Sequence, residues 1–322
     1  MEGPSTNERA TIDGPRSLDD MTAGQLQDLL NSFDVVLSDC DGVLWNSDTP
    51  IPGAIATLKR LQDLGKTIYL VSNNTAVSVN RYKEKIRGLD IKMEHLVTPV
   101  IVMAWYLKKI DFHGEAYVVG SPPFRKMLAD CGVKMSSNDV PIIYDDEEDM
   151  SRSIDSATKV KAVDAVVVDF DMRCTLAKLS YVCQTLKNKD ILFLIGSTSE
   201  LIPVDQDRRV LGIGGLANLI SHYTGRKPIA CGKPSDVLKE YILELCKVDP
   251  KRCLFIGDSI NTDMVFASKC GFQKLFVEGG IDSLEETLQS DQTRPDYYAP
   301  CLAFLSKIMD TRLGSSRKLE KN

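Results

Sequence analysis

Two aspartates that follow an apolar run constrain the fold of this chain more than any other feature. Asp39 and Asp41 come after residues 33–37, whose apolar character predicts a buried strand that ends in a loop. A carboxylate at such a strand end is partly desolvated, which is costly unless positive charge faces it. Two interpretations are open: a turn in which Gly42 relieves the backbone, as in calcium loops, or an oxygen-rich site that attracts a metal ion and can attack phosphorus.

Three later segments have the same form, an apolar strand followed by polar residues. The first is the run 67–71, which leads into Ser72, Asn73 and Asn74. We expect the next helix to begin there, so that Ser72 and the N–H groups after it could donate to phosphate oxygens. A turn with an ordinary helix cap is the other interpretation.

The second and third segments contain a lysine and another pair of aspartates. Lys233 stands shortly before Ser235, which is expected to cap a helix, so the lysine is either a fixed point charge for a phosphoryl group or an exposed loop residue. Asp258 and Asp263 follow the expected strand 254–256. Each segment alone is a weak signal. Because sites in α/β sheets lie beyond the carboxyl ends of the strands, the four clusters together predict one site.

The charges of these residues predict a bound cation. The four aspartates, if all are ionised, leave about three negative charges that Lys233 does not balance. Mg²⁺ fits because it usually takes one or two carboxylates together with water and substrate phosphate. Zinc is not favoured, since no histidine lies in any of the four segments and Cys40 is expected to point away from the carboxylates.

The four segments together resemble the signature motifs of a known family. The motifs are Asp39-Cys-Asp-Gly-Val-Leu-Trp, Ser72-Asn-Asn, Gly232-Lys-Pro-Ser and Gly257-Asp-x-x-x-Thr-Asp263. They are similar to those of the haloacid-dehalogenase-type phosphatases, and more narrowly to the group of 4-nitrophenylphosphatase, phosphoglycolate phosphatase and pyridoxal-phosphate phosphatase (chronophin). The resemblance extends from about residue 31 to about residue 310.

The resemblance implies a covalent mechanism. Asp39 would be the nucleophile that becomes an aspartyl-phosphate, and Asp41 would protonate the leaving oxygen and later activate water. Mg²⁺ would be held by Asp39, the backbone carbonyl of Asp41 and Asp258, with Asp263 supporting from nearby. Phosphoryl transfer needs positioning and neutralisation of charge, which a metal ion and a lysine supply.

The resemblance also implies the function. The phosphoryl group would be bound by Ser72, Asn73, Asn74 and Lys233. The predicted function is a Mg²⁺-dependent phosphatase, a phosphoric monoester hydrolase that acts on small phosphorylated metabolites. The other class considered is a catalytically weak binding or regulatory protein on the same fold, and the complete set of catalytic side chains favours the enzyme.

Composition and charge limit the partners and the location. The chain of 322 residues has a net charge of −6, which disfavours nucleic acid as a partner because binding to a phosphate backbone needs a basic surface. Its nine cysteines are scattered without a framework of pairs, so reduced thiols in the cytoplasm are expected. Residues 1–30 are polar and no apolar run approaches about 18 residues, so neither secretion nor a membrane partner is expected.

Strand and helix signals alternate along the chain and predict an α/β fold, a doubly wound parallel sheet of the Rossmann-like hydrolase type with an inserted α/β cap domain. The expected strands are 33–37, 67–71, 254–256 and 274–277 in the core and 116–119, 165–168 and 191–195 in the insertion. The expected domains are a polar tail with a short helix capped by Ser17 at 1–30, a core at 31–106 and 230–310, a cap at 107–229 and a C-terminal tail at 311–322.

The expected cap departs from those of the resembled phosphatases in the loop that selects the substrate. Relatives carry Thr-Asn/Asp-x-Asp there, whereas this chain reads Gly196-Ser-Thr-Ser-Glu, with Ile202 in place of a histidine. Asp169 also stands where a glycine is common. The resemblance therefore implies a cap that lowers over the site, without implying phosphoglycolate or pyridoxal phosphate as the substrate. The resemblance also implies a homodimer through the cap, which is known in the family.

Overall fold

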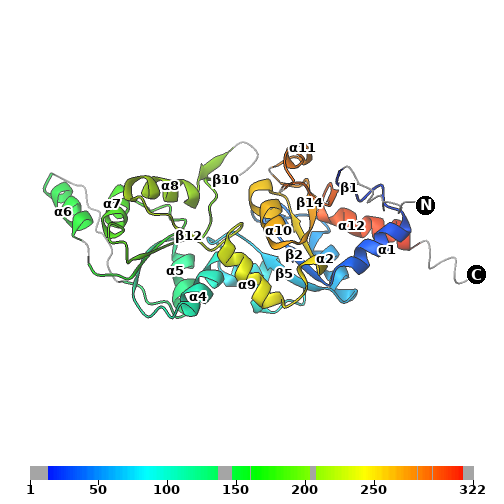
Figure 1. Ribbon diagram of the computed structural model, residues 1–322, viewed down its shortest axis with the longest axis horizontal. Helices are drawn as coiled ribbons and strands as arrows, with labels where there is room; N and C mark the ends of the chain where they lie inside the picture. Colours follow the sequence, from blue (N-terminus) through cyan, green and yellow to red (C-terminus); the bar gives the residue numbers. More distant parts are fainter. Residues whose placement is uncertain are drawn as a thin grey trace, which may run out of the picture.

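The computed structural model describes residues 14–136, 147–159, 161–203, 208–280, 282–291 and 293–314. The predicted tails before residue 14 and after residue 314 lie outside the described residues. The molecule is elongated and contains two parallel sheets (Figure 1). One sheet lies beside helix α1 (Ala23–Ser32), and the other lies toward the opposite end, beside helix α8 (Ile213–Thr224).

The larger sheet has seven strands, and every neighbouring pair in it is parallel. In spatial order the strands are β1 (Arg16–Ser17), β15 (Tyr297–Ala299), β14 (Gln273–Val277), β13 (Cys253–Gly257), β2 (Val35–Ser38), β5 (Thr67–Val71) and β6 (Leu96–Val97). The chain runs outward from β2 to β5 and β6 and later returns on the other side of β2. The strand order therefore changes direction between β2 and β13, and ligand sites of such folds lie at the carboxyl ends of the strands at this point.

Alternate residues of β2 point to opposite faces of this sheet. Val36 packs with helices on one face, and Val35 and Leu37 pack with helices on the other. A strand that is apolar at successive positions is what a parallel sheet covered on both sides requires. The helices on the first face are α1, α2 (Ala54–Asp63) and α12 (Leu302–Ile308), and those on the second are α4 (Pro99–Lys109), α9 (Asp236–Cys246) and α10 (Val265–Cys270).

The second sheet has four parallel strands, in the spatial order β12 (Ile229–Ala230), β9 (Leu192–Ile195), β8 (Ala165–Val168) and β7 (Ala116–Val119). On one face, Val118, Val167 and Leu194 share an apolar cluster with α4 and α9. The opposite face packs against other helices. These are α6 (Glu147–Thr158), α7 (Leu176–Thr185) and α8, while α5 (Pro122–Asp130) lies on the first face. The predicted fold class, a doubly wound parallel sheet with a second α/β unit, is confirmed.

Shorter elements complete the described chain. Two antiparallel hairpins are present, β3 with β4 and β10 with β11. Their strands are β3 (Trp45–Asn46), β4 (Thr49–Pro50), β10 (Leu201–Pro203) and β11 (Arg209–Leu211), and the remaining helical segments are α3 (Val79–Lys85), α11 (Leu284–Thr287), the 3₁₀ turns Met93–His95 and Pro250–Arg252, and the π turns Ile260–Met264 and Met309–Leu313.

Two expectations about helix starts are wrong. The first helix is capped by Thr22, whose side chain accepts from the N–H of Gln25, whereas Ser17 lies in β1. No helix begins directly after Ser72, because α3 is capped by Ser78 and an irregular segment lies between them. No helix dipole therefore acts at Ser72, and the contacts of its own side chain determine its environment.

The domain boundaries remain predictions. Helix α4 spans the predicted boundary between residues 106 and 107, and its residues Val102 and Leu107 belong to an apolar cluster that includes residues of both sheets. Within the described residues, no helix is long and apolar enough to cross a membrane.

Candidate functional site

Three aspartates meet where strands β2 and β13 end side by side. Asp39 follows β2, and Asp258 follows β13. Both are buried, as is Asp263, and one carboxylate oxygen from each of the three lies within 4.8 Å of the others. The N–H of Asp39 donates to the carbonyl of Ile256 at 2.8 Å, so the pairing of β2 with β13 itself fixes where Asp39 stands. The structure thus brings together three of the four aspartates that were predicted to form the site.

Lys233 supplies the positive charge at the centre of this cluster. Its ammonium nitrogen lies 2.7 Å from Oδ1 of Asp39 and 2.7 Å from Oδ1 of Asp263, and the residue is 1% exposed. Burial alone would lower the pKa of Lys233, but the attraction of Asp263 and Asp39 outweighs burial and raises it. The lysine is therefore a fixed cation, and the alternative of an exposed loop lysine is wrong.

Burial and mutual repulsion disfavour the charged forms of the carboxylates. Burial, followed by repulsion from Asp263, raises the pKa of Asp39 to about 7, although Lys233 opposes this. Burial and the charges of Asp39 and Asp263 also raise the pKa of Asp258 well above its usual range. Carboxylates held together against such penalties provide a strong attraction for a cation.

Glycines make room for the carboxylate of Asp258. Gly42 has a positive φ of 86°, and a Cβ on it would lie 2.0 Å from an oxygen of Asp258. A Cβ on Gly280, in the turn after β14, would lie only 1.5 Å from the same oxygen. Only residues without a side chain fit at these two positions. Gly42 is part of the predicted motif, whereas Gly280 was missed; the pair Gly279-Gly280 after a strand was the signal that could have found it.

Protein groups already occupy both oxygens of Asp263. Oδ1 pairs with Lys233, and Oδ2 accepts from the N–H groups of Asp258 at 3.1 Å and Ser259 at 3.2 Å. These bonds tie the turn after β13 to the lysine. They leave the carboxylates of Asp39 and Asp258 as the ones better placed to face a bound cation.

Asp41 stands apart from the three clustered carboxylates. Its side chain accepts from the indole N–H of Trp45 at 3.1 Å and from the amide of Asn74 at 3.4 Å. Burial raises the pKa of Asp41, while Asn74, Lys85 and Trp45 oppose the rise. Lys85 is a second nearby cation that the charge count from the sequence missed, and its position on α3 gave no signal of proximity.

Ser72 is buried and is held by neighbours from its own segment of chain. Its hydroxyl oxygen accepts from the N–H of Asn74 at 3.1 Å and lies 2.9 Å from the hydroxyl of Tyr82. The hydroxyl of Tyr82 also lies 3.1 Å from the carbonyl of Asn74. Tyr82 was not predicted as part of the site, since a tyrosine in an amphipathic helix usually signals only core packing.

Asn73 links the lysine to the second sheet. Its Oδ1 accepts from the backbone N–H of Lys233 at 2.8 Å, and its Nδ2 donates to the carbonyl of Lys233 at 3.0 Å. The same amide lies 3.3 Å from the hydroxyl of Ser197, in the loop after β9. The side chain of Asn73 is therefore occupied in fixing the backbone of Lys233.

The donor set fits a hard divalent cation. The clustered groups are carboxylates only, and no histidine or cysteine joins them among the described residues. Cys40, between the two catalytic candidates, packs in the apolar cluster of Val36 instead. Oxygen ligands of this kind suit Mg²⁺.

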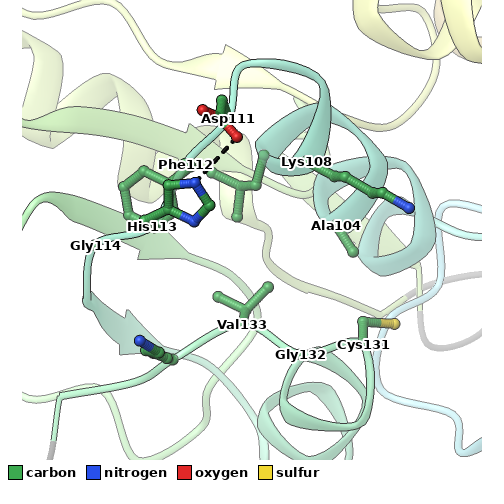
Figure 2. A pocket seen from close by; sticks show the side chains of 11 residues that line it. Ala104, Lys108, Asp111, Phe112, His113, Gly114, Cys131, Gly132 and Val133 are labelled. Atoms are coloured by element: carbon green, nitrogen blue, oxygen red, sulfur yellow. Dashed lines mark ion pairs between the residues drawn. The ribbon is translucent and has the colours of Figure 1, made fainter.

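A pocket elsewhere contains none of the predicted site residues. It lies between the end of α4, the start of β7 and the end of α5, and has a volume of about 290 Å³ (Figure 2). His113 and Asp111 form an ion pair of 3.0 Å at its edge. The side chains around it are mixed in character, so the pocket does not compete with the carboxylate cluster as the candidate site.

Comparisons with known proteins agree with this geometry. A family model described as haloacid dehalogenase-like hydrolase matches residues 36–134, and a second, described as HAD-hydrolase-like, matches residues 230–305. The 4-nitrophenylphosphatase of Schizosaccharomyces pombe is 32% identical over 88% of this chain and 96% of its own length. Chronophin of Bos taurus is 31% identical over 88% of this chain and 96% of its own. The crystal structure of a 4-nitrophenylphosphatase from Thermotoga maritima covers 87% of this chain and 98% of that chain with a TM-score of 0.71 at 23% identity.

This chain belongs to the haloacid dehalogenase-like hydrolase family. Within the family its relatives are named as phosphatases, which confirms the predicted resemblance and the predicted class of enzyme, a phosphoric monoester hydrolase. The structural match shows the same fold.

Proposed function

We propose that this protein is a Mg²⁺-dependent phosphatase that hydrolyses small phosphate monoesters through a phosphorylated Asp39. The observation that carries the proposal is the buried contact of 2.7 Å between Asp39 and the ammonium of Lys233. A carboxylate held beside a fixed cation at the end of a central strand is positioned to attack phosphorus while the lysine balances the charge of the phosphoryl oxygens.

In the first half of the reaction, an oxygen of Asp39 forms a bond to phosphorus as the bond to the leaving oxygen breaks. Asp41 gives its proton to that oxygen, so the product leaves as an alcohol. The raised pKa of Asp41, caused mainly by burial, favours the protonated form that this step needs. Lys233 and Ser72 stay in contact with the phosphoryl oxygens during the transfer.

In the second half, water attacks the phosphorus of the aspartyl-phosphate and Asp41 takes the proton of that water. The bond between phosphorus and Asp39 breaks, which releases inorganic phosphate and restores both carboxyl groups. One carboxyl therefore acts first as an acid and then as a base. Trp45 and Asn74, which both donate to Asp41, hold it in one orientation for the two steps.

Asp39, Asp258 and the backbone carbonyl of Asp41 are proposed as the ligands of Mg²⁺, with Asp263 orienting Lys233 and the turn after β13. When bound, the ion supplies neutralisation of the charge on the transferring group. Asn74 is proposed to act through Asp41, and Asn73 through the backbone of Lys233, in addition to any contact of their N–H groups with phosphate.

The substrate class follows from the predicted cap, residues 107–229. The loop Gly196-Ser-Thr-Ser-Glu has Ser197 and Ser199 where the resembled phosphatases have Asn or Asp and Asp, and Ile202 follows where they have a histidine, so we propose poor activity on pyridoxal phosphate and modest activity on 4-nitrophenyl phosphate. A missing hydrogen bond in a closed site lowers specificity by about ten- to a hundred-fold.

Two further expectations remain proposals. A homodimer through residues 107–229 is supported by exposed apolar side chains there, among them Leu201, Leu211 and Tyr223, and light scattering of the purified protein would decide it. A cytoplasmic location is supported by the nine cysteines, all of which are free.

Hydrolysis of a panel of phosphorylated metabolites with Mg²⁺ tests the function. We expect release of inorganic phosphate from small monoesters and none from the Asp39→Asn protein. Tight binding of a phosphorylated metabolite without hydrolysis would instead favour the binding or regulatory protein considered above.

A further inference from the structure

Two loops of the second sheet contact the loop that follows β5. Asp169 comes directly after β8, and Ser197 comes shortly after the neighbouring strand β9. The hydroxyl of Thr75 donates to Oδ1 of Asp169, and the amide of Asn73 lies 3.3 Å from the hydroxyl of Ser197. The segment that contains Ser72 and Asn73 is therefore attached to the second sheet at two points.

Asp169 is the unusual member of these contacts. It is fully buried, and Oδ1 accepts from Thr75 and from the N–H of Phe170 at 2.7 Å. Its other oxygen, Oδ2, has no hydrogen-bond partner among the described residues. A Cβ on Gly196 would lie 2.0 Å from Oδ2, so the backbone that follows β9 lies directly against this oxygen.

Among the residues that the structure describes, no positive charge compensates Asp169. The groups packed around it are Thr75 from the loop after β5, Gly196 from the end of β9 and the thiol of Cys231 after β12. Burial raises the pKa of Asp169 to about 7, and only the bonds from Thr75 and Phe170 oppose this. Burial, with a smaller effect of Asp169, raises the pKa of Cys231 to about 12, so the thiol stays neutral. The uncharged acid is the form that this environment accepts.

We propose that Asp169 is a positioning residue: as an uncharged carboxylic acid it holds Thr75, and through Thr75 the loop with Ser72 and Asn73, against the second sheet. Because Asn73 also fixes the backbone of Lys233, the contact between Asp169 and Thr75 affects two of the groups that bind the phosphoryl oxygens. The effect on turnover rests on the proposed phosphatase function, whereas the effect on stability does not.

Ionisation of Asp169 destabilises the packing of this loop on the second sheet, because the cost of burying the charge exceeds what the bonds from Thr75 and Phe170 contribute. An unpaired carboxylate must either remain buried at a high free-energy cost or separate the loop from the second sheet and reach water. The pKa of Asp169 is raised in the folded protein, so its contribution to the free energy of unfolding is complete below about pH 4. This contribution is lost progressively between about pH 4 and pH 7 and stays lost at higher pH. The loop should be held most firmly in mildly acidic solution.

The test compares the wild-type protein with Asp169→Asn, whose amide has the same shape and no charge at any pH. Thermal unfolding is measured at about pH 5 and about pH 8.5, with and without Mg²⁺, and the difference in Tm between the two proteins is taken at each pH. We expect the Tm of Asp169→Asn to increase relative to the Tm of the wild type as the pH rises. The control is Asp171→Asn, in the same loop, where the carboxylate pairs with Lys178 at 3.4 Å. The Tm of this control should not increase relative to the wild type as the pH rises.

Turnover supplies the second measurement. We expect the ratio of wild-type to Asp169→Asn kcat/KM to fall by about five-fold between those two pH values, mainly through KM. A difference in Tm that is the same at both pH values would overturn the proposal, whatever the activity. If no phosphate ester is hydrolysed at all, the proposed function fails while the Tm comparison still decides the role of Asp169.

Thr75→Val covers the case in which Asp169→Asn does not fold. This variant keeps the shape of residue 75 and removes its hydroxyl. It should raise KM by about five-fold in mildly acidic solution and by less above about pH 8, where the contact is already weak. An equal effect at both pH values would also contradict the proposal.

Discussion

The ammonium of Lys233 lies 2.7 Å from Oδ1 of Asp263, and both side chains are almost completely buried. Asp263 holds the turn after β13 with its other oxygen, so a single carboxylate connects the lysine to the strand end that carries Asp258. Buried ion pairs add little net stability when complete, but removal of one partner leaves a charge without compensation.

Asp263→Asn should therefore destabilise the protein by up to about 3–5 kcal/mol and lower kcat, because Asp39 alone would then balance the buried ammonium. Urea unfolding measures the first effect. Asp34→Asn is the matched control, since Asp34 also pairs with a cation, Arg252, but at the surface, and its loss should change stability little. Equal losses of unfolding free energy in the two variants would mean that the burial of Lys233 does not affect stability.

Asp39→Asn should abolish turnover and leave the fold intact. An amide of the same shape is a poor nucleophile and a weaker metal ligand. Hydrolysis of 4-nitrophenyl phosphate should fall by more than about a hundred-fold, with an unchanged circular dichroism spectrum. Residual activity above one-hundredth of the wild type would exclude Asp39 as the nucleophile.

Trp45→Phe should lower kcat about ten-fold on phosphate esters of aliphatic alcohols, and less on 4-nitrophenyl phosphate, whose leaving group needs little protonation. An aromatic ring remains at position 45, but Asp41 loses the indole donor that lowers its pKa. The alkaline limb of the kcat profile should therefore move to higher pH. The second tryptophan provides the control: Trp105 packs against Tyr241 on α9, and Trp105→Phe should leave the profile where it is.

Activity should require Mg²⁺, and excess Ca²⁺ should inhibit, since Ca²⁺ prefers more ligands at longer distances and misplaces the nucleophile. Mg²⁺ should also raise Tm, and more so at about pH 8 than at about pH 5, because burial and repulsion keep the carboxyl of Asp39 protonated at low pH. Full activity in a chelator, with no metal found by elemental analysis, would contradict the charge argument.

The elements with a strong sequence signal were predictable. Strand β5 and strands β7 and β8 have the predicted bounds, because each is a short apolar run flanked by polar residues. The short strands β1 and β15, at one side of the larger sheet, were missed, since two or three residues carry no periodic pattern. Their pairing is decided by the neighbouring strand rather than by local propensity.

The proximity of Asp39 and Asp258 was predictable for a related reason. Asp39 and Asp258 follow buried strands that pair with each other, so their proximity follows from the order of the strands. Contacts between distant segments were not predictable: the sequence gives no sign that Asn73 holds Lys233 or that Thr75 meets Asp169. Such contacts depend on how the second sheet sits on the first.

The position of Lys233 has a consequence for the engineering of this protein. The lysine follows the last strand of the second sheet, β12, after only Cys231 and Gly232, and the N–H of Cys231 still bonds to Ile195 in β9. An exchange of the whole second sheet between relatives, with a junction after Lys233, would therefore move the lysine that faces Asp39 along with the sheet. A chimera that keeps turnover must join the two parents upstream of β12 or transfer Asn73 together with the exchanged unit.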